Sequence, residues 1–432
     1  MDLFEIAKNG VVGAGGAGFP THIKLDSRPD TLIMNAAECE PLLHKDMEML
    51  RAHTDRILRG LEIALDLTGA AAGIIGIKSK HRDVVRVLSD RAHSRIRVKT
   101  LGDFYPAGDE ITLIYLTTGR VVQPGELPIS VGCVVQNVET LFNIAGDTPV
   151  VEKFISVAGA VTEPATVRVP IGISYADVLA KFSISTPAYV VRSGGLMMGV
   201  LEKNLNQVVD KRTGALIVLP EDHHCVTMYR RFATPHDTDR IAKAGCDQCT
   251  FCTEFCPRYL LGHPVRPETA MRNRMFTREE EPRVDLGSAF CCECNLCTMY
   301  ACPESLDPRG ATVIEKRYVM QKKMKWEGRP VSPHPMMDFR KVPTKKLMQR
   351  LDVLKFQDDG PLSALEFAPQ SVRLPLRQHV GAPAVPIVAR GDVVQKYDLI
   401  AEANGKISAN IHASIDGRVT DVTQHEIVIQ RN

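Results

Sequence analysis

Eight of the twelve cysteines in this 432-residue sequence fall into two dense runs. The first run has the spacing C-x2-C-x2-C-x3-C-P, and the second has C-x2-C-x2-C-x4-C-P. The runs consist of Cys246, Cys249, Cys252 and Cys256, followed by Cys291, Cys294, Cys297 and Cys302. Thiolates at this spacing bind cubane iron–sulfur clusters. We therefore expect two 4Fe-4S clusters, which carry electrons one at a time.

The two runs are expected to exchange one ligand. In two-cluster ferredoxins, the fourth cysteine of each run ligates the cluster of the other run. One cluster should then be bound by Cys246, Cys249, Cys252 and Cys302, and the other by Cys256, Cys291, Cys294 and Cys297. The additional residue before Cys302 departs from the usual spacing.

Zinc is the alternative metal, because paired C-x2-C knuckles bind it tetrahedrally. Two consecutive two-residue spacings, followed by a fourth cysteine in a Cys-Pro pair, occur in both runs and favour iron–sulfur ligation. Outside this pattern, we expect Cys292 to be a spectator, and Cys133 and Cys225 to be small buried hydrophobic residues.

A glycine-rich stretch near the start, GVVGAGGAGFPTHIK at 10–24, contains the pattern G-x-G-x-x-G. The dinucleotide fingerprint needs a strand before the glycines and a helix that starts on them. Residues 3–7 instead predict a short helix that ends at Gly10, and Pro20 restricts Phe19 to an extended backbone. The stretch is therefore not the usual fingerprint, and a flexible connecting loop remains an alternative.

The elements that would position these glycines form βαβ units. Apolar patterns predict strands at 31–35, 71–78 and 95–101, and helices at 47–67 and 81–93. This alternation is typical of a mostly parallel sheet, whose ligands bind at the carboxyl ends of the strands. Polar motifs occur at such ends, namely NAAECEP, YPAGDE and VVQNVETL.

Four motifs in series carry a resemblance to known families. GAGGAGFPTHIK, NAAECEP, YPAGDE and QNVETL resemble the flavin-binding subunit of respiratory NADH:quinone oxidoreductase. They resemble more closely the C subunit of Rnf-type ferredoxin:NAD oxidoreductases. The resemblance implies a Rossmann-like domain that binds FMN non-covalently, with NADH stacked on the flavin.

The resemblance also implies which residues bind these cofactors: Gly13, Gly15, Gly16, Gly18, Phe19, Lys24, Asn35, Glu38, Glu40, Asp109, Glu110, Asn137 and Thr140. The glycine backbones would let the cofactor approach closely, since a β-carbon there would collide with it. Phe19 would stack on the nicotinamide nucleotide, and Lys24 and Thr140 would serve the flavin phosphate.

In the same comparison, Asn35 and Asn137 would hydrogen-bond polar atoms of the flavin, and Glu40 and Glu110 would contact the nucleotide. Structural roles are the alternatives: Asn35 as a strand cap, Glu110 in the first turn of a helix and Phe19 in the core.

The sequence departs from the respiratory protein at two positions. Ala14 replaces an arginine and Ala37 replaces an acid, so flavin contacts from those side chains are absent. Cys39, beside Glu40, fits the Rnf-like version and is expected to be a packing residue, because a reactive thiol needs an exposed, electropositive setting.

The remaining sequence predicts two further modules and a connector. Residues 149–232 predict a small α+β unit that resembles the soluble-ligand-binding β-grasp domain, with a structural spacer as the alternative. A proline-rich connector follows the clusters and contains a predicted helix at 344–354. The tail is rich in Val, Ile and glycine turns and resembles a barrel-sandwich module. Lys406 lies at a predicted turn without the acid that precedes a lipoylated lysine, so a solvated lysine is expected.

The order of the modules narrows the resemblance. In the Rnf protein a barrel-sandwich module precedes the flavin domain, whereas here it follows the clusters. This order, and the doubled cysteine in FCCECNLC, resemble the cobalamin reductases of propanediol-utilisation microcompartments over essentially the whole chain. That family implies NADH-dependent reduction of cob(III)alamin and cob(II)alamin to reactivate a B12-dependent diol dehydratase. The implied partners are the corrinoid, an adenosyltransferase, the diol dehydratase and shell proteins, in the cytoplasm or inside a microcompartment.

The expected fold is therefore α/β and multidomain. The expected parts are an FMN/NADH-binding domain at 1–148 (the first domain), a β-grasp domain at 149–232 (the second domain), a ferredoxin-like helical domain at 233–330 (the cluster domain), a linker and helix at 331–370, and a barrel-sandwich hybrid domain at 371–432 (the C-terminal domain).

Composition limits the other classes of function. The net charge is +2 with interspersed signs, which argues against nucleic acid as a partner, and no apolar run is long enough to predict a transmembrane segment. Two rival functions remain: an Rnf-like electron-transfer protein that passes electrons between NADH and ferredoxin in a membrane complex, and a scaffold protein whose clusters are structural.

Overall fold

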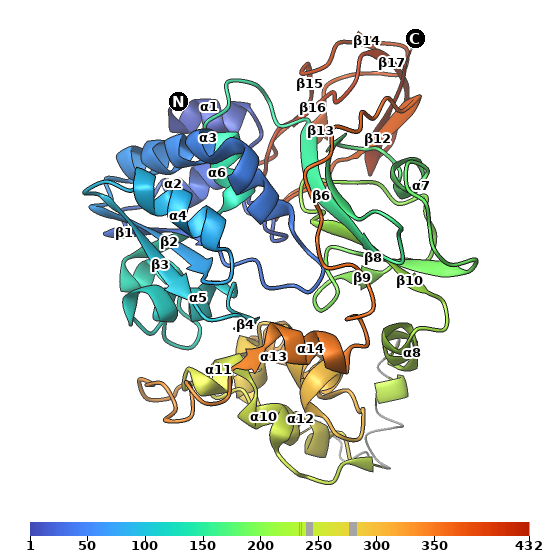
Figure 1. Cartoon of the computed structure of the whole chain (residues 1–432). Coiled ribbons are helices and arrows are strands. Elements are labelled where there is room, and N and C mark those ends of the chain that lie inside the picture. Colours follow the sequence, from blue (N-terminus) through green and yellow to red (C-terminus); the bar gives the residue numbers. More distant parts are fainter. Residues whose placement is uncertain (233, 235, 239–244, 276–282, 432) are drawn as a thin grey trace.

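The structure is a computed structural model that describes residues 1–232, 234, 236–238, 245–275 and 283–431. In Figure 1 the first domain (blue) and the second domain (green) lie side by side, and the cluster domain (yellow to orange) lies below both. The C-terminal domain (red) lies at the opposite end, above the second domain. The chain is a mixed α/β protein built from several such parts.

The first domain is built on a four-stranded parallel sheet of order β3-β2-β1-β5. Its strands are β1 (Thr31–Ala36), β2 (Ala72–Lys78), β3 (Ile96–Leu101) and β5 (Cys133–Asn137). β1 and β2 are nearly continuous buried apolar runs, as expected for parallel strands covered on both faces. The parallel sheet predicted from the sequence is confirmed.

Helices connect and cover these strands. They are α1 (Leu3–Lys8), α2 (Thr21–Leu25), α3 (Lys45–Thr68), α4 (Arg82–Arg91), α5 (Glu110–Thr118), the 3-10 turn η1 (Pro128–Val131) and α6 (Val138–Ile144). The predicted helices at 47–67 and 81–93 correspond to α3 and α4. α3 ends at Gly69, whose φ of 69° is the left-handed conformation that glycine adopts at helix ends.

The second domain contains a five-stranded mixed sheet of order β7-β6-β10-β8-β9. Its elements are β6 (Glu152–Gly159), β7 (Ala165–Pro170), α7 (Tyr175–Leu179), β8 (Tyr189–Ser193), β9 (Val200–Leu201), β10 (Ala215–Pro220) and α8 (His224–Arg231). β6 pairs parallel with β10, and the other pairs are antiparallel. The α+β composition predicted for this part is confirmed.

The cluster domain consists of short helices around the two cysteine runs. They are α10 (Phe251–Glu254), α11 (Pro257–Leu260), α12 (Pro267–Asn273), the 3-10 turn η2 (Leu286–Phe290), a π-helical turn η3 (Cys297–Ala301) and α13 (Pro308–Gln321). Both Cys-Pro pairs end a cysteine run, and Pro257 is the first residue of α11.

The segment at 331–370 packs against the other domains rather than linking them loosely. β11 (Val342–Pro343) pairs with β4 (Phe104–Tyr105) of the first domain, and Thr166 of β7 donates its backbone N–H to Pro361 O at 3.0 Å. α14 (Thr344–Arg350) is shorter than the predicted helix at 344–354, because Asp352 takes a left-handed φ of 58°.

The C-terminal domain contains a four-stranded sheet, β12-β18-β17-β14, and a three-stranded sheet, β13-β15-β16. The strands are β12 (Ser371–Pro375), β13 (Val385–Pro386), β14 (Val393–Val394), β15 (Leu399–Glu402), β16 (Ile411–His412), β17 (Gly417–Val422) and β18 (Glu426–Gln430). The two sheets share one apolar core, and Lys406 is exposed in a turn as expected.

Candidate functional site

The glycine-rich stretch folds into a closed loop, here called the glycine loop (13–19). Gly13 N donates to Phe19 O at 2.9 Å, and Gly18 N donates to Gly13 O at 3.1 Å. Val12 and Pro20 form an isolated antiparallel bridge just outside it. These bonds give the loop a defined shape rather than that of a flexible connector.

The glycines of this loop have different surroundings and therefore different structural roles. Gly16 has a φ of 105°, and a β-carbon built there would meet nothing within 4 Å. A β-carbon on Gly15 would only touch the Asn137 side chain at 3.4 Å. On Gly18 it would lie 2.9 Å from Arg212 Cδ, so this glycine serves the packing of the second domain. The open side of the loop is therefore at Gly15 and Gly16, both of which are exposed.

Below the glycine loop lies a buried network of charges that sequence inspection missed. Lys45 Nζ lies 2.7 Å from Asp46 Oδ1 and 2.9 Å from Glu139 Oε2. Lys153 from β6 also contacts Glu139 and donates to Ala14 O at 3.1 Å. Burial lowers the pKa of Lys153 to about 8, whereas the pKa of Lys45 is raised because its adjacent carboxylates outweigh its burial.

The two asparagines expected to face the flavin are already paired with protein groups. Asn35 Nδ2 donates to Gly108 O at 2.8 Å, and Asn35 Oδ1 accepts from Ala37 N. Asn137 caps α6 and donates to Asp46 Oδ2 at 2.7 Å. Thr140 Oγ1 accepts from Ala14 N at 2.9 Å, so it anchors the glycine loop.

The two glutamates that follow β1 differ. Glu40 accepts from the backbone N–H groups of Met197 and Met198 at 2.7 and 2.8 Å, so it binds the 194–199 loop of the second domain. Glu38 Oε2 is buried and has no hydrogen-bond partner among the described residues. Burial and the neighbouring Asp46 raise the pKa of Glu38 to about 7. An unsatisfied carboxylate at this sheet edge fits a site for a polar cofactor.

The remaining charged candidates form ion pairs. Lys24 Nζ lies 2.7 Å from Glu110 Oε1, and both are partly exposed. Asp109 caps α5 and lies 2.9 Å from Arg258 Nη2, a residue of the cluster domain two positions after Cys256. Asp109 therefore joins the first domain to the cluster domain. Phe19 is half-buried.

Four cysteines drawn from both runs line one small hollow in the cluster domain. They are Cys246, Cys249, Cys252 and Cys302. The first three come from one run and the fourth from the other, which is the set that the exchange of ligands predicts. A cavity walled by four thiols fits an iron–sulfur cluster.

The complementary cysteines also gather together. Burial, and then the neighbouring Cys292 and Cys291, raise the pKa of Cys256. Burial, and then Cys291, Cys252 and Cys256, raise the pKa of Cys297. Cys294 is likewise influenced by Cys256. Cys292 lies within this group although its position breaks the spacing.

The other cysteines are packing residues. Cys133 and Cys225 are fully buried, and Cys225 Sγ donates to Leu351 O at 3.1 Å. Burial raises the pKa of Cys39 to about 12, and its Sγ accepts from Gly108 N at 3.4 Å. An unreactive thiol at position 39 agrees with the sequence interpretation.

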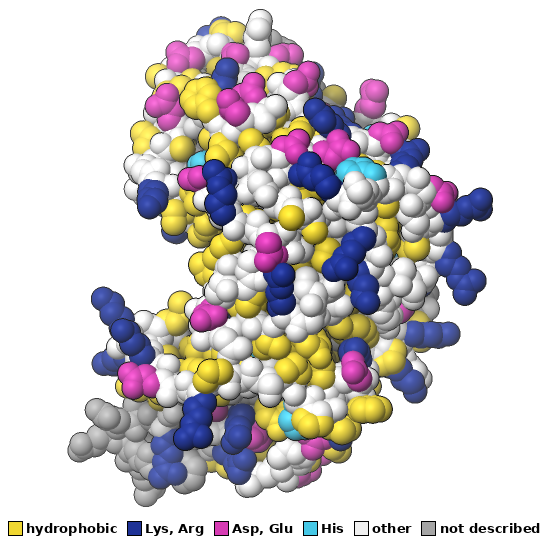
Figure 2. Space-filling view, turned by 90° about the vertical axis from the view of Figure 1, so that its left-hand side faces the viewer, with side chains coloured by type: hydrophobic (Ala, Val, Ile, Leu, Met, Phe, Trp, Pro, Cys, Tyr) yellow, Lys and Arg dark blue, Asp and Glu magenta, His cyan; other side chains and the backbone are white. Residues whose placement is uncertain are grey.

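Surface features of the described residues are unremarkable in charge. On the face shown in Figure 2, Lys and Arg side chains are interspersed with Asp and Glu.

Among the residues described, none of the helices is both long and apolar enough to span a bilayer. In the same residues, no group of three or more His, Cys, Asp or Glu could hold a single metal ion.

Three family models match separate parts of the chain. The Nuo51 FMN-binding domain matches residues 6–146, the 4Fe-4S dicluster domain matches 245–307, and the RnfC barrel sandwich hybrid domain matches 355–432. These matches support FMN and iron–sulfur as the cofactors. They make the chain an oxidoreductase that transfers electrons through flavin and iron–sulfur domains.

Two curated proteins are similar to this chain over nearly its full length, and both have the same name. The chain is 39% identical to cobalamin reductase PduS of Citrobacter freundii over 431 residues, which cover 98% of this chain and 94% of that protein. Cobalamin reductase PduS of Salmonella typhimurium gives the same identity and coverage. The C component of the Na⁺-translocating ferredoxin:NAD⁺ oxidoreductase complex of Acetobacterium woodii is 34% identical over 265 residues, 58% of this chain and 56% of that protein. The resemblances predicted from the four motifs and from the order of the modules are confirmed.

Proposed function

Because the chain belongs to the family of cobalamin reductase PduS, we propose that it passes electrons from NADH through FMN and two 4Fe-4S clusters to a cobalt corrinoid. The reaction reduces cob(III)alamin and cob(II)alamin and so reactivates a B12-dependent diol dehydratase. FMN, when bound, accepts a hydride as an electron pair and releases single electrons.

The first domain supplies the flavin and NADH site in this proposal. Gly15 and Gly16 give the cofactor access to the loop backbone, and the partnerless oxygen of Glu38 is a polar contact for it. Lys153 and Thr140 hold the loop through Ala14, which fixes the glycines before any ligand binds. The paired side chains of Asn35, Asn137 and Glu40 then shape the walls, alongside Phe19, Lys24, Asp109 and Glu110.

The cluster domain supplies the path for single electrons. The observation that carries the proposal is the hollow lined by Cys246, Cys249, Cys252 and Cys302, since only folded cysteine runs that exchange ligands produce this set. The ion pair between Asp109 and Arg258 keeps the two domains in contact beside Cys256. A second cluster would take Cys256, Cys291, Cys294 and Cys297.

The further parts of the proposal concern boundaries and surroundings. We assign the FMN/NADH domain to 1–148, a β-grasp domain to 149–232, the ferredoxin-like domain to 233–330, the packed linker to 331–370 and the barrel-sandwich domain to 371–432. The protein acts in the cytoplasm or inside a bacterial microcompartment, where an adenosyltransferase, the diol dehydratase and shell proteins are its partners.

An anaerobic assay tests this function. The purified chain, without membranes, is mixed with NADH and hydroxocobalamin, and the corrinoid spectrum is followed. We expect reduction of the corrinoid at a rate that depends on protein concentration. A protein whose iron–sulfur absorbance does not bleach with NADH would instead favour a scaffold with structural clusters.

A second candidate is an Rnf-like role, in which the chain exchanges electrons between NADH and ferredoxin in a membrane complex. The match of residues 355–432 to the RnfC barrel sandwich hybrid domain favours it. Its identity to such Rnf-type proteins, however, extends over only 58% of this chain in the Acetobacterium woodii case. Reduction of ferredoxin but not of hydroxocobalamin would support this candidate.

A further inference from the structure

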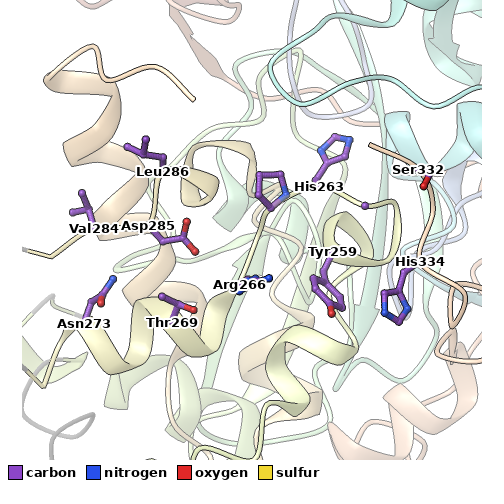
Figure 3. A pocket seen from close by; sticks show the side chains of 12 residues that line it. Tyr259, His263, Arg266, Thr269, Asn273, Val284, Asp285, Leu286, Ser332 and His334 are labelled. Carbon is purple, nitrogen blue, oxygen red and sulfur yellow. The ribbon is translucent and has the colours of Figure 1, made fainter. Parts of the chain in front are cut away.

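A second hollow, of about 670 Å³, opens on the cluster domain away from the glycine loop. Its walls come from α11, α12, the segment before η2 and residues 332–334, as Figure 3 shows. Its volume lies within the range of about 300–1,000 Å³ that is usual for small-molecule sites. None of the cofactor residues expected from the sequence lines it.

The hollow adjoins the second group of cysteines. Tyr259, in its wall, lies on α11, which begins at Pro257 directly after Cys256. On the other side, Leu286 begins the η2 turn that leads directly to Cys291. Two chain segments that hold cluster ligands therefore also form the walls of the hollow, and a bound molecule would lie close to the second cluster.

The walls are fixed before a ligand arrives. Gly262 has a φ of 89°, and a β-carbon there would lie 2.1 Å from Ser332 O, so only glycine allows these two segments to meet. His334 N donates to Leu260 O at 2.9 Å. His263 Nε2 lies 2.8 Å from Val122 O, which ties this wall to the first domain. The hollow is thus a built feature of the fold.

The lining combines two aromatic rings with polar groups. The rings of Tyr259 and His334 lie 5.2 Å apart at 35° and form one side. Figure 3 shows Arg266 between Tyr259 and Thr269, with Asn273 further along α12. The guanidinium, hydroxyl and amide groups can donate to or accept from the amides of a ligand.

We propose that this hollow binds the edge of the corrinoid, as the exit site for electrons from the cluster of Cys256, Cys291, Cys294 and Cys297. The proposal rests on the proposed function. A corrinoid offers a flat macrocycle for the rings and a rim of amide side chains for the polar groups. In each transfer the reduced cluster loses one electron and the cobalt gains it, and NADH resupplies electrons through the flavin.

The position of the hollow distinguishes the corrinoid from the hydride donor. None of the described residues of the first domain lines it, so a dinucleotide bound there would not lie against Gly15 or Gly16. A one-electron acceptor, in contrast, needs contact only with the surroundings of a cluster. The electron donor and the electron acceptor are therefore bound on different domains.

Binding of cyanocobalamin to the oxidised holoprotein tests the site by equilibrium dialysis, with the free corrinoid measured in the protein-free chamber. Thr269→Trp fills the hollow, and Arg266→Ala removes a polar contact. Met320→Trp is the matched control, because Met320 is 64% exposed on α13 and does not line the hollow. Iron and flavin contents verify that each variant is loaded.

We expect Thr269→Trp to weaken binding by at least about tenfold, which corresponds to about 1.4 kcal/mol. Arg266→Ala should weaken it severalfold and Met320→Trp should leave it unchanged. NADH-driven bleaching of the clusters should be normal in all three. If Thr269→Trp loses its clusters, the binding measured for Arg266→Ala decides whether the hollow is the corrinoid site.

Two outcomes would overturn the assignment separately. In the first outcome, the wild-type protein reduces hydroxocobalamin with NADH, but the loaded variants bind and reduce the corrinoid as the wild type does, or the wild type itself shows no measurable binding. Either result would refute the assignment of the hollow alone. A wild-type protein that neither binds nor reduces a corrinoid would refute the proposed function and the hollow with it.

Discussion

The cluster domain and the first domain bring their functional residues together in opposite ways. The eight cysteines of the two runs lie within 246–302, and their spacing alone predicts which four line the first hollow. The site at the glycine loop combines residues from Ala14 to Lys153, contributed by several elements. The spacing of residues that are close in sequence therefore predicts which residues bind a ligand. For a site built from distant parts of the sequence, the motifs predict only the region in which the site lies.

The difference also concerns what the side chains do. In the cluster domain, the thiols that line the first hollow are themselves the expected ligands. In the first domain, Asn35, Asn137 and Glu40 are occupied by protein partners, and the open surface is glycine backbone. Motif residues there build the walls of a site as much as they bind its ligand.

The largest expected effect is on the clusters. If the runs exchange ligands, Cys256→Ala combined with Cys291→Ala should remove one cluster and about half of the iron. Cys256→Ala combined with Cys252→Ala should remove nearly all of it, because the two thiols belong to different clusters. Iron and acid-labile sulfide analysis measures both results.

Cys133→Ala is the control, since Cys133 is fully buried in the first domain. It should retain all its iron. Equal iron loss in the two double variants would contradict the exchange, and zinc in place of iron and sulfide would contradict cluster ligation altogether.

The next effect concerns the backbone of the glycine loop. Gly16→Val would place a branched side chain in the open space at Gly16, and we expect flavin occupancy to fall about tenfold, since filling a ligand's volume costs about 1–3 kcal/mol. Cluster absorbance should survive, because the cysteines lie in another domain. Flavin fluorescence after denaturation measures the occupancy.

Gly69→Val is the matched control for backbone strain. Gly69 also has a positive φ and open space around it, but it ends α3 far from the loop in sequence. Both variants should lose a similar amount of stability, about 1–3 kcal/mol. Full flavin in Gly16→Val would remove the glycine loop from the flavin site.

Glu40→Ala should have a smaller effect, on the contact between domains. It removes a carboxylate that accepts two backbone N–H groups of the 194–199 loop, and such bonds contribute about 1.5–3 kcal/mol each. We expect a lower thermal midpoint than for Glu163→Ala, an exposed surface control. An unchanged midpoint with a raised KM for NADH would mean that Glu40 serves the nucleotide and not the loop.

The last expected effect is a pH dependence where Lys211 contacts the backbone of Gly10 and Asn410. Lys211 Nζ donates to Gly10 O at 2.6 Å and to Asn410 O at 2.9 Å, and burial lowers the pKa of Lys211 to about 7. Between pH 7 and the usual lysine pKa, the unfolded state binds more protons, so stability from this group rises with pH. The slope approaches about 1.4 kcal/mol per pH unit in that window and vanishes below it.

Thermal midpoints of the wild type and Lys211→Met measure this dependence. Their difference should shift in favour of the wild type as pH rises from 7 to 10. Lys406→Met, at an exposed turn, should show no such trend. A difference that is constant with pH would mean that Lys211 titrates normally.

The strong periodicity of apolar residues made the helices and strands predictable, whereas the buried charged residues could not be predicted. The apolar patterns of β1 and α3 match their observed bounds within two residues. Lys45 and Lys153, in contrast, look like ordinary polar positions of a helix start and a strand. They become buried only because Glu139 of α6 meets both of them in the folded chain. Lys153 lies near the start of β6, which is buried along nearly all of its length, and this position beside an apolar run was the available signal.

The packing of residues 331–370 against the other domains could also not be predicted from the sequence. β11 pairs with β4 through only two residues on each side, too few for a recognisable strand pattern. The second hollow has no motif at all, because Tyr259, Leu286 and His334 meet through folding around the cysteines.

The path from NADH through flavin and clusters to a corrinoid is tested most directly by comparing holoprotein with protein stripped of flavin. Each is mixed anaerobically with NADH and hydroxocobalamin, and cob(II)alamin is measured. The holoprotein should form about two cob(II)alamins per NADH, because a hydride carries two electrons. Flavin-free protein should form none with NADH, but it should still reduce the corrinoid once its clusters have been reduced with dithionite and the excess dithionite has been removed. Equal NADH-driven reduction by both proteins, or bleached clusters beside a corrinoid that stays oxidised, would contradict this path.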